Sequence, residues 1–269
     1  MKHLRFLRGA AAVSLGAVVS KGIGAVYRIV LASLLSGVGM GLYQMAYPFF
    51  CLFLMLTSAG AGPALSRIVA RERALGRSGR GALFAGLRLF AGLGGAGGVL
   101  LALLAPVLSA LQGADLAAGY VFLAPAVLLC AVISVLRGYF QGRGRMAPTA
   151  LSEVLETLVK AGLGVFFALL FRGDAPRAAR FALLAVTLSE GAALIYLLSR
   201  LGGERCVPDL RPRQGAAELV PVVLPVMAAS CILPLSQAVD SVLLPRLLGG
   251  GEGAVLAYGL LAGGALALA

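Results

Sequence analysis

The sequence contains no tryptophan, one histidine and few charged residues. Only 13% of its 269 residues are Asp, Glu, Lys or Arg, whereas 60% are hydrophobic. A soluble chain of this length would form about two domains and would carry about 25% charged residues. The composition therefore excludes a soluble globular protein. Without tryptophan, an aromatic belt at the membrane surface has to depend on tyrosine.

Acidic residues are scarce as well, with 11 against 23 basic residues and a formal net charge of +12. Such a charge is found in nucleic-acid-binding proteins, where basic residues alternate with aromatic residues that stack on bases. Here the basic residues lie between apolar segments and lack that alternation. We therefore expect no nucleic-acid partner.

The residue patterns of common enzymes and metal sites are missing. The sequence has no GxSxG, P-loop or HExxH motif, and its one histidine, His3, lies in a basic N-terminal segment. Its four cysteines stand singly without metal-ligand spacing, which favours a role as small hydrophobic residues. They are Cys51, Cys130, Cys206 and Cys231. We expect no enzyme activity, no metal and no cofactor.

Long runs without charge are the main positive signal. Four of them cover residues 29–66, 89–114, 116–136 and 219–239, with 38, 26, 21 and 21 residues. A transmembrane helix needs about 20 apolar residues to cross about 30 Å of hydrocarbon. The sequence therefore predicts a multi-pass helical membrane protein. The predicted spans are 10–36, 42–60, 82–111, 117–136, 147–171, 178–199 and 219–248, with an eighth starting near 254.

The basic residues between these spans predict the orientation, because cytoplasmic loops retain positive charge. If the N-terminus is cytoplasmic, 15 Lys and Arg residues lie in cytoplasmic segments and four in outside loops. The cytoplasmic set includes Arg67 to Arg80 and also Arg137. We expect an inner-membrane protein with a cytoplasmic N-terminus, and glycine-rich turns at 36–41 and 249–251.

Several ionisable residues fall inside predicted spans, where each costs about 2.5 to 3.5 kcal/mol near a helix centre. Lys21 and Arg28 are seven residues apart, so they share one helix face. No acid lies on that helix, which favours a cationic cavity over simple pairing. Glu153, Glu156 and Lys160 share a face of the fifth span. Glu190 and Asp240 lie in the sixth and seventh spans. These five residues could line the cavity or couple transport, or they could only pair across helices.

Seven segments, in order along the chain, resemble one family. They are Ser20–Arg28 (SKGIGAVYR), Gly41–Pro48 (GLYQMAYP), Leu65–Gly76, Arg137–Gly142 (RGYFQG), Ala147–Glu156, Pro234–Asp240 and Ala257–Leu261. Together they are similar to the stage V sporulation protein B group of polysaccharide transporters. That group is related to the lipid II flippases (MurJ) within the multidrug/oligosaccharidyl-lipid/polysaccharide (MOP) exporter superfamily. Leu65–Gly76 corresponds to the cytoplasmic loop after the second helix.

The resemblance implies an all-α fold in which two six-helix lobes enclose a cationic cavity that opens alternately to each side. Residues 1–200 would form the first lobe, 201–218 a cytoplasmic linker and 219–269 the start of a second lobe. Family members have about twice this length, so we expect the second lobe to be incomplete. Lys21 occupies the position of a cavity cation, and Arg28 lies close to a second such position.

The implied function is flipping of undecaprenyl-pyrophosphate-linked saccharide, with the lipid tail remaining in the bilayer. The partners implied are lipid-linked oligosaccharide, membrane lipids and proteins of cell-wall or spore-envelope synthesis. Two alternatives remain open. A cation-coupled multidrug exporter of the same superfamily would need an acidic first-lobe cavity, and a non-transporting scaffold for cell-wall assembly would need no cavity charge.

Overall fold

The described parts of the chain are entirely helical. The computed structural model describes residues 2–202 and 220–267, and in these ranges it contains nine helices and no strand. The helices are α1 (Lys2–Leu34), α2 (Ser36–Ser58), α3 (Ala61–Ala74), α4 (Arg80–Gln112), α5 (Ala117–Gly142), α6 (Ala147–Leu170), α7 (Ala175–Gly202), α8 (Val220–Leu247) and α9 (Gly251–Ala267). The predicted linker 201–218 lies almost wholly outside the described residues.

Six helical segments of the described chain are long and apolar enough to cross a membrane. They are Val13–Leu34, Ser36–Ala74, Arg80–Gln112, Ala117–Gly142, Ala175–Gly202 and Val223–Leu247. Helix α6 is absent from this set because it carries Glu153, Glu156 and Lys160 within its 24 residues. Its length of about 36 Å would still cross a bilayer. The chain is therefore a multi-pass membrane protein, as its composition predicts.

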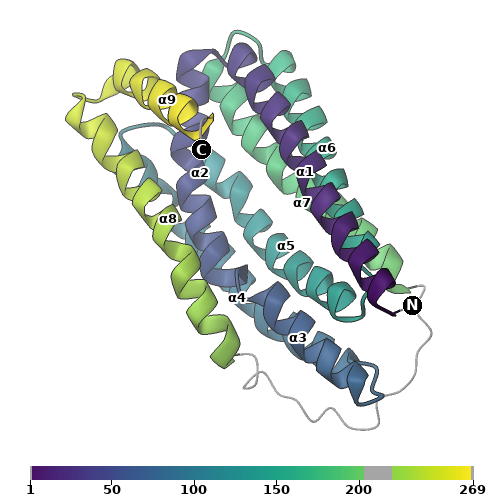
Figure 1. The fold of residues 1–269 in the computed structure, drawn as a ribbon. Coiled ribbons are helices and arrows are strands. Elements are labelled where there is room, and N and C mark those ends of the chain that lie inside the picture. The colour runs from purple at the N-terminus through teal and green to yellow at the C-terminus, as the bar shows by residue number, and fades with distance from the viewer. Residues whose placement is uncertain (1, 203–219, 268–269) are drawn as a thin grey trace.

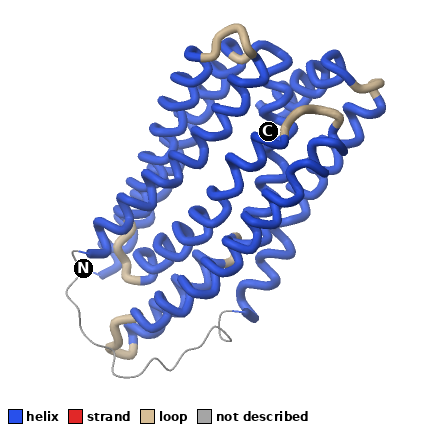
Figure 2. The backbone as a smooth tube through the Cα atoms, turned by 180° about the vertical axis from the view of Figure 1, so that it is seen from behind, coloured by secondary structure: helices blue, strands red, loops and turns tan. Residues whose placement is uncertain are grey.

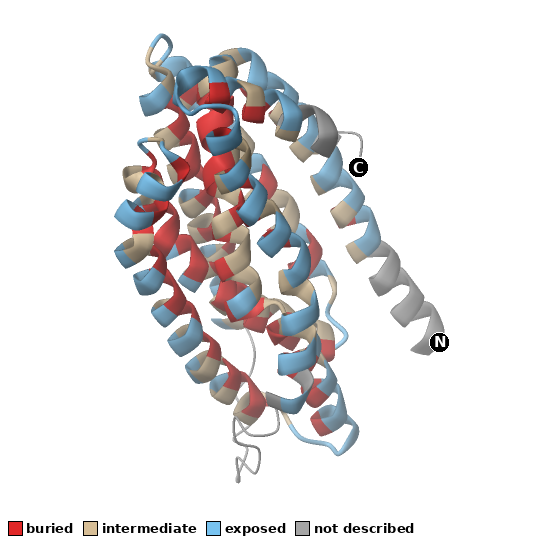
Figure 3. Ribbon diagram, turned by 90° about the vertical axis from the view of Figure 1, so that its left-hand side faces the viewer, coloured by how far each residue is buried: buried red, intermediate tan, exposed pale blue. Residues whose placement is uncertain are grey.

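The helices run roughly along one direction and form a bundle. Helix α1 lies beside α6, which packs against α7, on one side, whereas α8 and α9 lie on the far side against α2 (Figure 1). Helix α5 packs against both α4 and α7 and so joins the two sides. Seen from behind, the short loops connect neighbouring helices at the two ends of the bundle (Figure 2). Buried residues gather inside the bundle, while the described part of α1 carries many exposed ones (Figure 3).

The glycine-rich segment 36–41 is helical, so the predicted turn there is wrong. The helix is interrupted only at Leu35, and α2 begins at Ser36, which has a left-handed φ of 60°. A Cβ on Gly41 would come 2.3 Å from the carbonyl oxygen of Val255 in α9. Likewise, a Cβ on Gly259 would come 2.8 Å from the Cα of Gly41. These glycines therefore allow α2 and α9 to approach closely, a common use of glycine between membrane helices.

The segment after the second span is also helical, where the sequence indicated a loop. Leu65 and Val69 in α3 are completely buried, whereas Arg67 and Arg71 on the opposite face are exposed. Apolar and basic residues thus alternate with the period of an amphipathic helix. The many arginines suggested a loop. The segment is a helix because one of its faces is apolar and buried.

Small residues allow the backbones of α3 and α5 to pack directly against each other. A Cβ on Gly138 would lie 2.5 Å from the carbonyl oxygen of Gly62, and one on Gly142 would lie 2.6 Å from that of Ser66. Both pairs are spaced four residues apart, so each helix presents its small residues on one face. This contact explains the two glycines of the RGYFQG segment.

Replacing Gly138 with alanine should destabilise the fold by about 1 to 3 kcal/mol, because the added methyl group meets backbone that has no free space. The matched control is Gly92→Ala in α4, where a Cβ would meet nothing within 4 Å. Thermal unfolding in detergent, followed by circular dichroism, compares the two variants. Equal stability of both variants would contradict the close packing of α3 on α5.

The orientation predicted from the basic residues can be tested at the two ends of α4. Leu75 precedes this helix and Asp115 follows it, and their side chains are exposed, at 61% and 77%. Since α4 is about 50 Å long, they lie on opposite sides of a membrane. In a cysteine-free background, we expect Asp115→Cys to react with an impermeant thiol reagent in intact cells and Leu75→Cys to be protected. The reverse labelling would invert the orientation.

Candidate functional site

The two cations of α1 lie on one face of a continuous helix. Lys21 is exposed and Arg28 is half-buried, whereas Tyr27 and Leu31 are buried. Within the described residues, no acidic side chain comes within 4 Å of either cation. Arg28 acts electrostatically on Tyr43 of α2, so it faces the space between α1 and α2. Lys21 and Arg28 thus share one face of α1, and this face has no acidic partner in the part of the chain that the structure describes.

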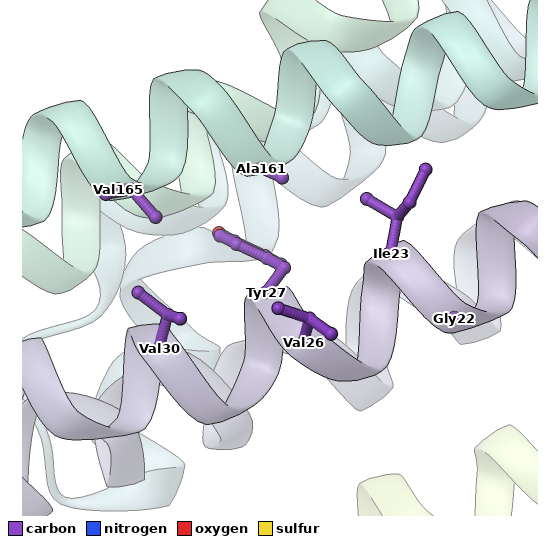
Figure 4. Close-up of a pocket in the computed structure, with 7 residues that line it drawn as sticks. All are labelled: Gly22, Ile23, Val26, Tyr27, Val30, Ala161 and Val165. Carbon is purple, nitrogen blue, oxygen red and sulfur yellow. The ribbon is translucent and has the colours of Figure 1, made fainter.

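An apolar crevice of about 380 Å³ lies between α1 and α6 (Figure 4). It is lined by Gly22, Ile23, Val26, Tyr27, Val30, Ala161 and Val165. Val30 follows Lys21 by nine residues, about 900° around the helix, and therefore lies on the opposite face. The crevice can accommodate hydrocarbon, but it faces away from Lys21 and Arg28 and is not part of the cationic site.

An ion pair joins α5 to α6. An Nη of Arg137 lies 2.9 Å from a carboxylate oxygen of Glu156, and the two side chains are only 19% and 16% exposed. The Nε of Arg137 also donates a hydrogen bond of 2.9 Å to the hydroxyl of Ser152. These two oxygens therefore fix the guanidinium, as is typical for an arginine kept inside a bundle.

Glu190 of α7 lies next to this pair. Helix α7 packs against both α5 and α6, and the charges of Glu156, Arg137 and Lys160 act on the Glu190 carboxyl group. The residue is buried, with 7% of its surface exposed. Glu153 is also within electrostatic range of Arg137 and Glu156. We call Arg137, Glu153, Glu156, Lys160 and Glu190 the inner charge cluster.

The structure brings together some of the predicted site residues and separates others. Glu153, Glu156, Lys160 and Glu190 meet in the inner charge cluster, on α6 and α7. Lys21 and Arg28 stand apart from it on α1. Asp240 is exposed on α8, where its charge acts on Tyr258, and within the described residues it forms no ion pair with the inner charge cluster.

Arg137 lies within a helix, beyond the end at residue 136 that the sequence predicts for the fourth span. It was expected in a cytoplasmic loop, because the charge-free run ends at residue 136. Helix α5 continues to Gly142, and Arg137 pairs inside the bundle. One signal was available: no loop-forming residue separates Arg137 from the apolar run, so the helix had no reason to end there.

A separate polar network attaches α8 to the first seven helices. The side-chain amide of Gln112 donates hydrogen bonds to the carbonyl oxygen of Met45 (2.8 Å) and to Ser241 (3.0 Å). The hydroxyl of Tyr120 donates to the Gln112 side-chain oxygen at 2.7 Å. Four helices meet at this one buried glutamine. The contact closes the end of the bundle at which α4 ends.

Comparison with known proteins identifies the family. Residues 6–265 match the polysaccharide biosynthesis protein family. The chain belongs to this family. Stage V sporulation protein B of Bacillus subtilis (strain 168) is 35% identical over 202 residues, which cover 73% of this chain and 39% of that protein. Lipid II flippase MurJ of the same organism is 31% identical over 168 residues, which cover 58% of this chain and 31% of that protein.

Solved structures show the same fold at lower sequence identity. A MOP superfamily transporter from Pyrococcus furiosus, whose binding pocket is described as having reverse polarity, superposes with a TM-score of 0.65 at 17% identity. The match covers 95% of this chain and 62% of that one. An outward-facing multidrug resistance MATE family transporter gives 0.64 at 19% identity, covering 98% and 65%. The expected all-α, MATE-like fold is confirmed. The matched segments span less than half of the two curated relatives from Bacillus subtilis.

Removing one partner of the Arg137–Glu156 pair should cost about 3 kcal/mol, because the remaining charge stays inside the bundle without a partner. Arg137→Met and Glu156→Leu should each lower the unfolding temperature strongly, and the double variant should recover most of the loss. The control is Arg77→Met, since Arg77 pairs with Glu72 but is 43% exposed. Additive losses in the double variant would show that the pair does not stabilise the bundle.

Proposed function

We propose that the protein is a membrane transporter that moves a lipid-linked saccharide with an anionic pyrophosphate group across the inner membrane. The cationic face of α1 carries this proposal. Lys21 and Arg28 have no acidic partner among the described residues, whereas Arg137 is paired with Glu156. A cation without a partner on a membrane-spanning helix is costly and calls for an anionic ligand or water.

The two cations suit a pyrophosphate group by their chemistry. Arginine offers a planar fork of donors that binds phosphate oxygens in pairs, and lysine adds a compact charge with three donors. They lie about 10 Å apart along the helix axis, since seven residues rise about 1.5 Å each. Such a spacing suits a headgroup that extends along the bundle while its apolar chain stays in the bilayer.

The relatives support the same class of substrate. One of them is named as a lipid II flippase, and the family is named for polysaccharide biosynthesis. From these names we infer a transporter and not an enzyme. Stage V sporulation protein B further suggests a role in the spore envelope. Proteins of cell-wall or spore-envelope synthesis are the partners that such a role would require.

We further propose that residues 1–200 form the first lobe of a two-lobe transporter, followed by a cytoplasmic linker at 201–218. Helices α8 and α9, within residues 219–269, would then begin the second lobe. Their contacts with α2 and with Gln112 would close the cavity on the side away from the cytoplasm. Alternating access would require these contacts to separate.

Neutral replacements of the two cations test the proposal. We expect Lys21→Gln and Arg28→Gln each to weaken binding of undecaprenyl pyrophosphate to the purified chain about tenfold, the effect of losing one charge-assisted hydrogen bond. Native mass spectrometry of the protein in detergent measures this binding. Arg177→Gln is the matched control, because Arg177 is 66% exposed and already pairs with Asp174.

The same substitutions at the chromosomal locus separate the alternatives. Loss of function in Lys21→Gln with normal protein levels supports a flippase that binds an anion. If only the acidic positions Glu156 and Glu190 matter, the result favours a multidrug exporter. If neutral replacements at all of these positions keep function intact, the scaffold alternative gains and the flippase proposal fails.

A further inference from the structure

One face of α2 carries two stacked tyrosines and a glutamine. The rings of Tyr43 and Tyr47, about one helical turn apart, are stacked with their centroids 5.8 Å apart and an interplanar angle of 23°. Gln44 precedes Tyr47 by three residues, so the two side chains are neighbours on the helix surface. Tyr43 is buried, whereas Gln44 and Tyr47 are half-buried. We call these three residues the α2 platform.

The α2 platform lies on the side of α2 that is turned away from α4 and α9. Gly41 packs closely against α9, and the carbonyl oxygen of Met45 accepts a hydrogen bond from α4. Tyr43 follows Gly41 by two residues, about 200° around the helix. Tyr47 follows Met45 by the same step. Both tyrosines therefore project from the face of α2 opposite these contacts.

The α2 platform also lies at the depth of the two cations of α1. Only Leu35 separates α1 from α2, so both helices run from this residue toward the other end of the bundle (Figure 1). At 1.5 Å per residue, Arg28 lies about 11 Å from Leu35 and Lys21 about 21 Å. Tyr43 and Tyr47 lie about 12 and 18 Å from the same residue. The platform is thus level with the interval between the two cations.

The side chain of Gln44 has an unused hydrogen-bonding group. Its carboxamide oxygen is buried and accepts no hydrogen bond from any described residue. A buried oxygen without a donor destabilises a fold, because the oxygen has lost its contact with water and gained nothing in return. Such an oxygen is expected where a ligand supplies the donor.

A saccharide has the chemistry that this face can bind. A sugar ring presents C–H groups on its two sides, and these groups pack against the electron-rich face of an aromatic ring. Its hydroxyl groups project from the ring edge and can donate to an amide oxygen. In a lipid-linked saccharide the first sugar is bonded directly to the pyrophosphate. A pyrophosphate at Lys21 and Arg28 would therefore hold that sugar at the depth of the α2 platform.

We propose that the α2 platform binds the first sugar of the lipid-linked saccharide. Tyr47 packs against the sugar ring, Gln44 accepts a hydrogen bond from a sugar hydroxyl, and the buried Tyr43 holds Tyr47 in position. This inference rests on the proposed function, because it takes the pyrophosphate to lie at the cations of α1. It adds recognition of the saccharide, which contacts to phosphate alone do not provide.

Binding of two lipids to the purified chain tests the proposal. Undecaprenyl pyrophosphate and the same lipid carrying one N-acetylglucosamine are compared by native mass spectrometry, and the wild type should bind the sugar-bearing lipid more tightly. Tyr47→Leu and Gln44→Leu should each weaken binding of the sugar-bearing lipid about fivefold, the effect of losing one ring contact or one hydrogen bond. Binding of the sugar-free lipid should not change. Tyr47→Phe keeps the ring and should keep most of the preference.

Tyr196→Leu is the matched control. Tyr196 is a half-buried tyrosine of α7 whose ring lies under the guanidinium of Arg200, at 5.1 Å. Its replacement should change binding of neither lipid. The same loss in Tyr196→Leu as in Tyr47→Leu would contradict a specific role of the α2 platform.

A stability measurement separates a binding role of Gln44 from a structural one. Because its side-chain oxygen has no donor, Gln44→Leu should leave the unfolding temperature of the ligand-free protein unchanged or raise it. A marked fall would show that Gln44 supports the fold, and it would count against the proposal. Gln44→Leu also carries the binding test if Tyr47→Leu fails to fold.

The two lipids distinguish failure of this proposal from failure of the proposed function. Equal binding of both lipids to the wild type, or an equal loss for both in Tyr47→Leu, would overturn sugar binding at the α2 platform. If Lys21→Gln still weakens both lipids in that case, the proposed function stands. Binding of neither lipid to the wild type would contradict both proposals.

Discussion

Charged side chains inside an apolar helical bundle have to be paired, hydrated or bound to a ligand, and this constraint accounts for the arrangement of the chain. Arg137 and Glu156 satisfy it by pairing with each other across α5 and α6. Lys21 and Arg28 have no acidic partner among the described residues, and they lie on the face of α1 opposite the apolar crevice. Paired charges of this kind hold the bundle together, whereas cations without an acidic partner are free to bind a substrate.

Small residues set how closely the helices can approach around these charges. Gly138 and Gly142 meet α3, while Gly41 and Gly259 join α2 to α9. Helices in a membrane gain little from hydrophobic burial against one another, so close backbone packing contributes more of their association. The two sets of contacts differ in place: one lies within the first seven helices, and the other joins them to α9. Helices that move against one another during transport would have to part at the second set.

The sequence predicted the membrane class, the approximate positions of six long apolar spans and the shared face of Lys21 and Arg28, because each depends on local composition and helix period. It failed where tertiary packing decides. Glycines that predict a turn at 36–41 proved to be contact residues, and the arginine-rich segment after α2 folded as a helix with a buried face. The position of Arg137 was missed because its partner, Glu156, lies 19 residues further along the chain. The proximity of Glu190 to this pair depends on how α7 packs, which no local pattern encodes.

The central claim is that the cations of α1 receive the pyrophosphate of a lipid-linked saccharide. The most direct measurement is an experimental structure of the protein in a lipid bilayer with undecaprenyl pyrophosphate bound. Our account predicts phosphate density in contact with Lys21 and Arg28, on the face of α1 opposite the apolar crevice. Phosphate density at any other place in the bundle, with Lys21 and Arg28 left without contact to it, would contradict the account.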